Sequence, residues 1–134
     1  MSKSIACIVY QNGKLFIAKR RSIGDMGGKW EFPGGKIEDD EAPELAIKRE
    51  MFEEFSVNVS VGEKIGSATF IHSGKNCSVD AYVVQFEHDG IKVPFVLTEH
   101  TEYKWVNPLE IKKLDFVDSD LKLYPYVLDY YKIK

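Results

Sequence analysis

Cysteine and histidine are scarce in this chain, and long apolar or basic runs are missing. Its only cysteines, Cys7 and Cys77, form no Cys-x-x-Cys pair and have no histidines in a zinc-type arrangement beside them. We therefore expect two buried, reduced thiols in place of a disulfide framework or a zinc centre. The three histidines are scattered along the sequence, and we expect each of them on the surface or in a strand, not as a metal ligand.

No apolar run is long enough for a secretion signal or a membrane span. The segment before the polar residues Gln11-Asn12-Gly13 contains only a short apolar stretch, so we expect a cytoplasmic protein without a membrane contact. The formal net charge is −3 and no Lys/Arg run occurs, so we expect no nucleic acid polymer as a partner. A small anionic ligand held through a metal ion is compatible with this charge.

The sequence also lacks internal repeats and low-complexity segments, which favours one compact unit. Its 134 residues, 44% of them hydrophobic, suffice for one sizeable core and are too few for two ordinary domains. We expect residues 1–134 to form a single domain, either as a monomer or as a homodimer.

Turn residues between β-favouring runs predict two hairpins. Asn12-Gly13 separates apolar runs at 5–10 and 15–19, and Asn-Gly is the strongest short hairpin signal. A turn at residues 73–76 separates two longer runs, at 64–72 and 77–87.

Apolar residues at helical spacing predict a C-terminal helix within residues 121–131. A proline inside a helix costs about 3 kcal/mol. Because Pro125 falls in this stretch, we expect the helix to begin near Tyr124, with the proline in its first turn.

The strongest local signals lie between Trp30 and Val57. Pro43 suits a first helical position because its missing N–H needs no partner there, and the acidic residues around it favour the positive end of a helix dipole. We therefore predict a helix that begins near residue 43. Leu45, Phe52 and Phe55 are spaced to share one stripe, and we expect this stripe to face the core.

Three glutamates of the predicted helix, Glu50, Glu53 and Glu54, stand at i, i+3 and i+4, so their carboxylates are expected to cluster on one side. Their mutual repulsion costs a few tenths of a kcal/mol per pair in water. A hard divalent cation would offset this repulsion, because Mg²⁺ and Mn²⁺ prefer oxygen ligands. A solvated acidic face is the alternative interpretation.

The wider spacing favours the metal site. Residues 35–57 read GKIEDDEAPELAIKREMFEEFSV. This segment resembles the Nudix box, G-x5-E-x7-R-E-U-x-E-E-x-G-U with U apolar, at every fixed position except Ser56, where the family usually has Gly. At the end of a helix this Gly takes a left-handed conformation, which Ser adopts at a cost of about 1 kcal/mol.

The resemblance implies an α/β fold, a Nudix-type α/β/α sandwich with a mixed β-sheet, over essentially the whole chain. It also implies Mg²⁺ as the cofactor, with Mn²⁺ compatible, held by the Gly34 carbonyl, Glu50, Glu53 and Glu54. Arg49 would orient the helix carboxylates through charge-assisted hydrogen bonds.

An acidic loop, followed by a strand that ends at Trp105-Val106 and a short helix begun by Pro108, extends the resemblance. In relatives such a loop supplies a further carboxylate that binds metal or accepts a proton, and we assign Glu99 to this role by position. A plain surface glutamate is the alternative. The general base is then one of Glu53, Glu54 and Glu99.

The segment WEFPGGKIE at residues 30–38 resembles the MutT branch of the family, which acts on nucleoside triphosphates. By position, this implies that Arg20 contacts phosphate, that Glu31 and Phe70 line the substrate site, and that Asp120 reads the base edge. The plainer alternatives are a charged strand terminus for Arg20, sheet core for Phe70 and a helix N-cap for Asp120. An ionised Asp at the base edge would accept a hydrogen bond from an exocyclic amine.

The expected function is Mg²⁺-dependent hydrolysis of a nucleoside triphosphate to a monophosphate and pyrophosphate. An oxidised nucleotide such as 8-oxo-dGTP, or CTP or a modified dCTP, is the expected substrate. Hydrolysis of ADP-ribose or another nucleoside diphosphate derivative is a second enzymatic alternative. A Nudix-fold nucleotide-binding protein without turnover is an alternative of another class, which the intact set of helix glutamates disfavours.

Overall fold

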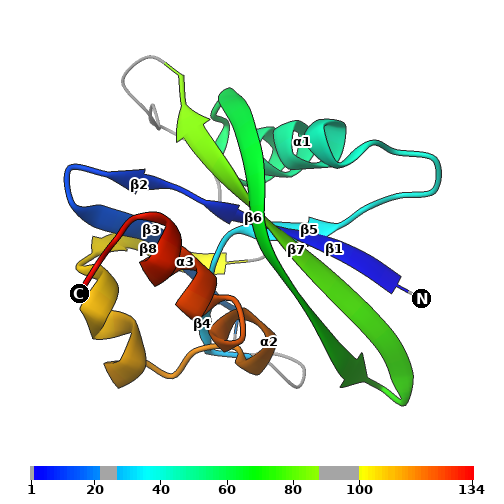
Figure 1. The fold of residues 1–134 in the computed structure, drawn as a ribbon. Coiled ribbons are helices and arrows are strands. Elements are labelled where there is room, and N and C mark those ends of the chain that lie inside the picture. Colours follow the sequence, from blue (N-terminus) through cyan, green and yellow to red (C-terminus); the bar gives the residue numbers. More distant parts are fainter. Residues whose placement is uncertain (1, 22–26, 88–99) are drawn as a thin grey trace.

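The computed structural model describes residues 2–21, 27–87 and 100–134. Strands and helices follow one another along the chain in this order (Figure 1): β1 (Ser2–Ile8), β2 (Tyr10–Gln11), β3 (Lys14–Arg20), β4 (Trp30–Glu31), β5 (Gly34–Lys36), α1 (Pro43–Phe55), β6 (Val59–His72), β7 (Lys75–Phe86), β8 (His100–Val106), the 3₁₀ helix η1 (Pro108–Lys113), α2 (Asp118–Leu121) and α3 (Tyr124–Tyr130).

Two sheets form the centre of the molecule. The first has the strand order β5-β1-β7-β6 and is mixed, because β1 runs parallel to β7 whereas the other neighbours are antiparallel. In the second sheet β3 pairs antiparallel with β2, β4 and β8. The predicted α/β fold with a mixed sheet is therefore confirmed.

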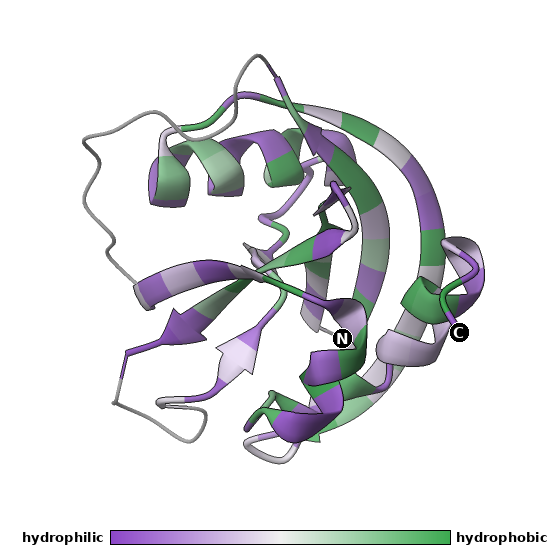
Figure 2. Ribbon diagram, turned by 90° about the vertical axis from the view of Figure 1, so that its left-hand side faces the viewer, coloured by the Kyte–Doolittle hydropathy of each residue, from purple (hydrophilic) through white to green (hydrophobic). Residues whose placement is uncertain are grey.

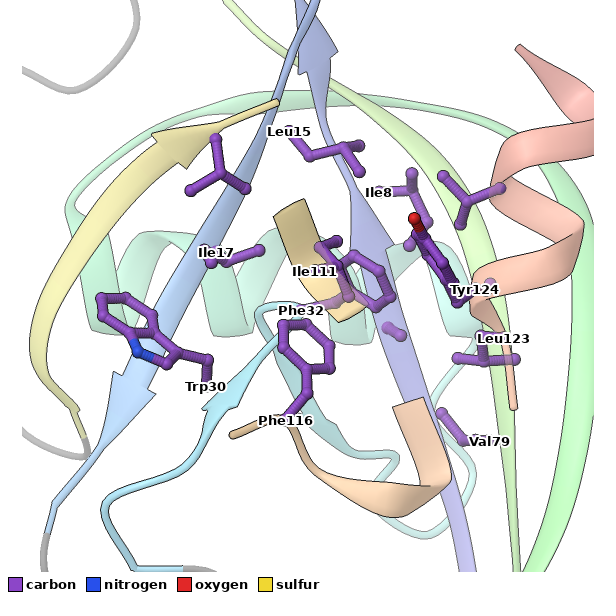
Figure 3. Packing of buried hydrophobic residues seen from close by; sticks show 14 residues of the cluster. Ile8, Leu15, Ile17, Trp30, Phe32, Val79, Ile111, Phe116, Leu123 and Tyr124 are labelled. Atoms are coloured by element: carbon purple, nitrogen blue, oxygen red, sulfur yellow. The ribbon is translucent and has the colours of Figure 1, made fainter. Parts of the chain in front are cut away.

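Two hydrophobic cores lie on opposite faces of these sheets, because successive side chains of a strand point in opposite directions. In β1, Ile5 and Cys7 belong to the core beneath α1, whereas Ala6 and Ile8 belong to the core beneath the C-terminal helices. The second core is shown in Figure 3, where Ile8 lies in one cluster with Leu123. Figure 2 shows α1 and the C-terminal helices on opposite sides of the strands, which is the expected α/β/α sandwich.

The first predicted hairpin is only partly correct. Asn12 and Gly13 form its turn with φ values of 52° and 77°, as a tight hairpin turn requires. The ladder next to this turn, however, is limited to the pairs that β2 makes with β3. The preceding strand β1 belongs to the other sheet, where it pairs with β5 and β7. In this position its side chains are buried in both cores.

The other expected elements are close to their predicted positions. The long strands β6 and β7 form the second hairpin, with register pairs from Val59 and Phe86 to His72 and Lys75. The C-terminal helix α3 begins at Tyr124, so that Pro125 lies in its first turn. The strand that ends at Val106 and the short helix that Pro108 begins are also present.

Helix α1 begins at Pro43 as predicted, but the expected core-facing stripe is wrong. Leu45 and Phe52 are 59% and 57% exposed. The buried face consists of Ala46, Ile47, Met51, Glu54 and Phe55. Ile47 lies about 200° around the helix from Leu45. Apolar spacing therefore identified the helix but not the direction of its buried face, and a glutamate is turned toward the interior.

Cys7 and Cys77 are both buried and reduced, as expected from the sequence. Burial raises the pKa of the Cys7 thiol far above its ordinary value, so this group remains a neutral, apolar core atom. Within the described parts of the chain, no helix has the length and apolar character needed to cross a membrane.

Candidate active site

A cavity of about 690 Å³ opens beside the Gly34-Gly35 segment, and we call it the site cavity. Its wall is formed by residues far apart in the sequence. Among the residues singled out by sequence, the following line it: Arg20, Glu31, Gly34, Glu50, Phe70 and Asp120. The fold thus brings together the proposed phosphate, base and metal residues that lie on its described walls.

The two glycines allow close approach at the floor of this cavity. Gly34 pairs with Ala6 of β1, and a Cβ at Gly34 would meet the backbone oxygen of Ile5. A Cβ at Gly35 would lie 2.6 Å from the carboxyl carbon of Glu50. The missing side chain of Gly35 therefore leaves room for the Glu50 carboxylate over the strand.

Arg49 lies at the centre of an ion-pair network between α1, the segment before it and β5. Its Nε and Nη2 donate to the two carboxylate oxygens of Glu41, at 2.8 and 2.9 Å. Its Nη1 donates to Glu50 at 3.0 Å and to Glu53 at 3.4 Å, and Nη2 also donates to the Lys36 carbonyl at 3.2 Å. The guanidinium thus forms charge-assisted hydrogen bonds with two of the predicted metal ligands.

The three helix glutamates have different surroundings. The side chain of Glu50 is 18% exposed and that of Glu53 is 60% exposed, whereas that of Glu54 is 9% exposed. Glu53 faces solvent beside Arg49, while Glu54 points inward to His100. The expected cluster on one side is therefore not present as a compact group in this structure.

The donor set nevertheless suits a hard cation. Gly34 and Glu50 both line the site cavity, Glu53 and Glu54 follow within the next turn of α1, and carboxylate and carbonyl oxygens are the ligands that Mg²⁺ and Mn²⁺ prefer. The space above Gly35 is occupied by the Glu50 carboxylate. Among the residues that the structure describes, no three His, Cys, Asp or Glu side chains are already grouped as a metal site. Glu99 lies outside the described residues.

His100 was not singled out as a site residue by sequence, and it lies between two carboxylates. It is the first residue of β8 and only 4% exposed. Its Nδ1 is 2.9 Å from Oε1 of Glu54, and its Nε2 is 2.8 Å from Oε2 of Glu31. Burial opposes the charged form, but the hydrogen bonds to Glu31 and Glu54 raise the pKa of His100 to about 9. At neutral pH both ring nitrogens therefore donate.

Glu31 joins this histidine to the proposed phosphate residue. Its Oε1 accepts a hydrogen bond from Nη1 of Arg20 at 3.1 Å, while its Oε2 contacts His100. The Arg20 side chain is 44% exposed and lines the site cavity. A guanidinium held from one side by a carboxylate keeps a defined orientation toward the cavity.

Asp120, within α2, also lines the site cavity. It is 6% exposed, and its Oδ2 accepts a hydrogen bond of 2.9 Å from the backbone N–H of Phe32. The N-cap residues of α2 and α3 are Val117 and Leu123, so the helix N-cap alternative for Asp120 is wrong. Burial, with the negative charge of Glu31, raises the pKa of Asp120 well above its ordinary range.

The sequence allowed Phe70 either in the sheet core or in the substrate site, and the structure places it at the boundary of both. It packs against the core beneath the C-terminal helices, and it also lines the site cavity. An aromatic ring at such a boundary offers an apolar surface to a ligand while the core holds it in place.

Comparison with known proteins agrees with this arrangement. Residues 2–127 match the NUDIX domain family. The chain is 32% identical to the CTP pyrophosphohydrolase of Escherichia coli (strain K12), over 92% of this chain and 88% of that protein. The chain belongs to the Nudix family. Hydrolases of this family generally use a divalent metal ion.

Two further relatives place the chain within the Nudix family. It is 45% identical to the 8-oxo-dGTP diphosphatase of Proteus vulgaris, over 45% of this chain and 52% of that protein. The solution structure of the E. coli ORF135 protein superimposes with a TM-score of 0.84 at 30% identity, covering 98% of this chain and 91% of that one.

Ser56, which departs from the Nudix box, keeps the geometry of the usual glycine. It follows α1 with φ 52° and ψ 38°, a left-handed conformation, and its N–H donates to the Phe52 carbonyl at 2.9 Å. Ser56 thus adopts the left-handed conformation that the usual glycine of the family would take. The substitution leaves the helix end in place and carries a local conformational cost instead.

Proposed function

We propose that this chain hydrolyses a nucleoside triphosphate to a nucleoside monophosphate and pyrophosphate with the help of Mg²⁺. The observation that carries this proposal is the site cavity, whose lining includes Glu50 and the glycine segment as well as Phe70 and Asp120. This lining combines oxygen ligands for a metal that holds phosphates with an aromatic ring and a carboxyl group that suit a base. The two curated relatives, a CTP pyrophosphohydrolase and an 8-oxo-dGTP diphosphatase, support the same reaction class.

We assign the cation to the oxygen atoms of Gly34, Glu50, Glu53 and Glu54, with Glu99 as a further carboxylate. Bound Mg²⁺, or Mn²⁺ in its place, supplies the positive charge that neutralises phosphate oxygens. Arg49 donates hydrogen bonds to both Glu50 and Glu53, and its positive charge offsets the repulsion between their carboxylates.

The remaining roles follow from the surroundings of each side chain. Arg20, held by Glu31, binds phosphate oxygens. One of Glu53, Glu54 and Glu99 accepts the proton of the attacking water. Proper placement of water and phosphorus supplies most of the acceleration, since phosphoryl transfer needs little covalent help from the protein.

We assign the base edge to Asp120. Because burial raises its pKa, this carboxyl group is protonated over more of the pH range than an exposed Asp and has an O–H donor as well as acceptor oxygens. A group with both functions pairs with a base edge that presents both a donor and an acceptor. An oxidised purine such as 8-oxo-dGTP, and CTP or a modified dCTP, are the substrates we propose.

The decisive assay measures pyrophosphate and phosphate release with Mg²⁺ across canonical and oxidised triphosphates and ADP-ribose, each with a metal-free control. We expect pyrophosphate and a monophosphate from one favoured triphosphate. Preferred cleavage of ADP-ribose would instead establish the diphosphate-derivative alternative. No turnover despite tight metal binding would establish a nucleotide-binding protein.

A matched pair of variants on α1 tests the metal assignment. Glu53→Gln should lower turnover by several orders of magnitude, because a lost metal ligand costs several kcal/mol of charge stabilisation. Glu44→Gln, which changes an exposed glutamate paired with Lys48 on the same helix, should leave turnover unchanged. Turnover of Glu53→Gln within about threefold of the parent would exclude Glu53 as a metal ligand.

Asp120→Ala tests the base assignment separately from the metal. We expect the ratio of kcat/KM values between two bases to change, because in this assignment the base is the part of the substrate that the lost group contacts. A uniform loss for every triphosphate would show that Asp120 does not read the base.

A further inference from the structure

His100 connects two parts of the candidate site that are distant in sequence. Its Nδ1 contacts Glu54 of α1 at 2.9 Å, and its Nε2 contacts Glu31 of β4 at 2.8 Å. The ring is 4% exposed and stacks on Phe55, with 5.8 Å between ring centroids and 22° between planes. Packing and two hydrogen bonds therefore fix the position and orientation of the imidazole.

Each contact bears on a different half of the proposed reaction. Holding Oε1 of Glu54 fixes the direction in which its second oxygen points, and this carboxylate is a proposed metal ligand. Holding Oε2 of Glu31 fixes the carboxylate whose other oxygen accepts from Arg20 at 3.1 Å. A continuous chain of hydrogen bonds thus connects the proposed phosphate residue with the proposed metal ligands of α1. It passes from Arg20 through Glu31 and His100 to Glu54.

We propose that His100 is a positioning residue that orients Glu54 for the cation through Nδ1 and, through Nε2 and Glu31, orients Arg20 for phosphate. This inference rests on the proposed function of the site. A buried histidine that only fills space between two carboxylates would instead affect both halves of the site in proportion to its effect on folding.

Replacing His100 by asparagine or by glutamine tests the two hydrogen bonds of the ring separately. The amide nitrogen of Asn stands the same number of bonds from Cβ as Nδ1, and the amide nitrogen of Gln stands the same number as Nε2. His100→Asn therefore retains a donor for Glu54, whereas His100→Gln retains a donor for Glu31.

Binding measurements, which need no turnover, test the metal site and the phosphate site separately. Mn²⁺ affinity, measured by the spin-resonance signal of the free ion, should fall about 10–100-fold in His100→Gln and stay within about threefold of the parent in His100→Asn. Affinity for inorganic pyrophosphate at saturating Mg²⁺ should show the opposite pattern, with the loss in His100→Asn. Urea midpoints of both variants serve as the folding control.

Two outcomes of these binding measurements would overturn the proposal. Equal losses in both variants that follow their urea midpoints would reduce His100 to a structural residue, as would unchanged affinities in both. These binding assays are independent of turnover, so an inactive parent that still shows the two patterns would reject the hydrolysis and leave the positioning role in place.

Nuclear magnetic resonance of the ring nitrogens in the unmodified protein provides a second test that does not depend on how well a variant folds. Addition of Mg²⁺ alone should shift the Nδ1 signal of His100 more than its Nε2 signal. Pyrophosphate added to the Mg²⁺-loaded protein should then shift the Nε2 signal. Ring signals that respond to neither addition would overturn the positioning role.

Discussion

Arg49 and Glu41 form a two-pronged ion pair, in which Nε and Nη2 of the guanidinium donate to the two carboxylate oxygens at 2.8 and 2.9 Å. Glu41 precedes α1, and its Oε1 also accepts from the backbone N–H of Glu38 at 3.0 Å. The glutamate therefore contacts both the loop that enters the helix and the arginine that donates hydrogen bonds to Glu50 and Glu53. In physical terms, the first Glu of the Nudix box is a support for the arginine.

Acid should weaken this support in a defined range. The hydrogen bonds from Arg49, aided by the Glu38 N–H, lower the pKa of Glu41 to about 2 from an ordinary value of 4.5. Because the pKa of Glu41 is lower in the folded protein, its contribution to stability is complete at pH values above the ordinary pKa. This contribution is lost as the pH falls toward the pKa of the folded state. Glu41→Gln should therefore lose stability at pH 7 but little at low pH, as read from urea midpoints. Glu44→Gln is the control; an equal loss at both pH values would refute the assignment.

Alanine at the two glycines of β5 should give opposite phenotypes. In Gly35→Ala the new Cβ displaces the flexible Glu50 carboxylate, so Mn²⁺ affinity should fall about tenfold while the unfolding free energy stays nearly unchanged. In Gly34→Ala the new Cβ meets the backbone of Ile5, so the fold should lose about 1–3 kcal/mol. Calorimetry and metal titration of both variants check this; a stability loss in Gly35→Ala as large as in Gly34→Ala would contradict it.

Asp120→Asn should change how stability depends on pH. Burial raises the pKa of Asp120, so the native state holds its proton more tightly than the unfolded chain, and this contribution to stability is lost as pH rises through the folded pKa. Asparagine cannot ionise and still has an oxygen for the Phe32 N–H. The variant should therefore become more stable relative to the parent as pH rises from about 5 to 9. Asp118→Asn, an exposed neighbour in α2, should show no such trend.

Ser56→Gly should stabilise the protein by about 1 kcal/mol, because glycine adopts a left-handed conformation without the steric cost that serine incurs. Ser56→Ala keeps this cost and should gain nothing. Thermal unfolding of the three proteins measures the difference, and a Ser56→Gly protein no more stable than Ser56→Ala would show that the serine is unstrained.

Signals confined to a few neighbouring residues predicted much of the fold. Asn12-Gly13 located a turn, Pro43 the start of α1 and Pro125 the start of α3, because each of these effects arises within one turn of backbone. The spacing of the Nudix box added the central helix and the family.

Features set by tertiary contacts were harder to predict. The spacing of apolar residues predicted that Pro43–Phe55 is helical but not which face of the helix is buried, so Leu45 and Phe52 were wrongly assigned to the core. The pairing of β1 was missed, although the unbroken run Ile5–Val9 is typical of a strand buried on both faces. His100 gave no signal beyond its place ahead of a strand, because its two carboxylate partners come close only in the folded chain.

The parallel pairing of β1 with β7 has a consequence for synthesis on the ribosome. Ser2 pairs with Cys77 and Ile8 with Val83, so β1 is translated well before its partner strand β7. The hairpin of β6 and β7 closes through neighbouring residues, whereas β1 joins across a long loop whose closure is slow. We therefore expect the nascent chain to expose the apolar segment Ile5–Val9 until β7 has emerged, which makes this segment the natural binding site for a chaperone during translation.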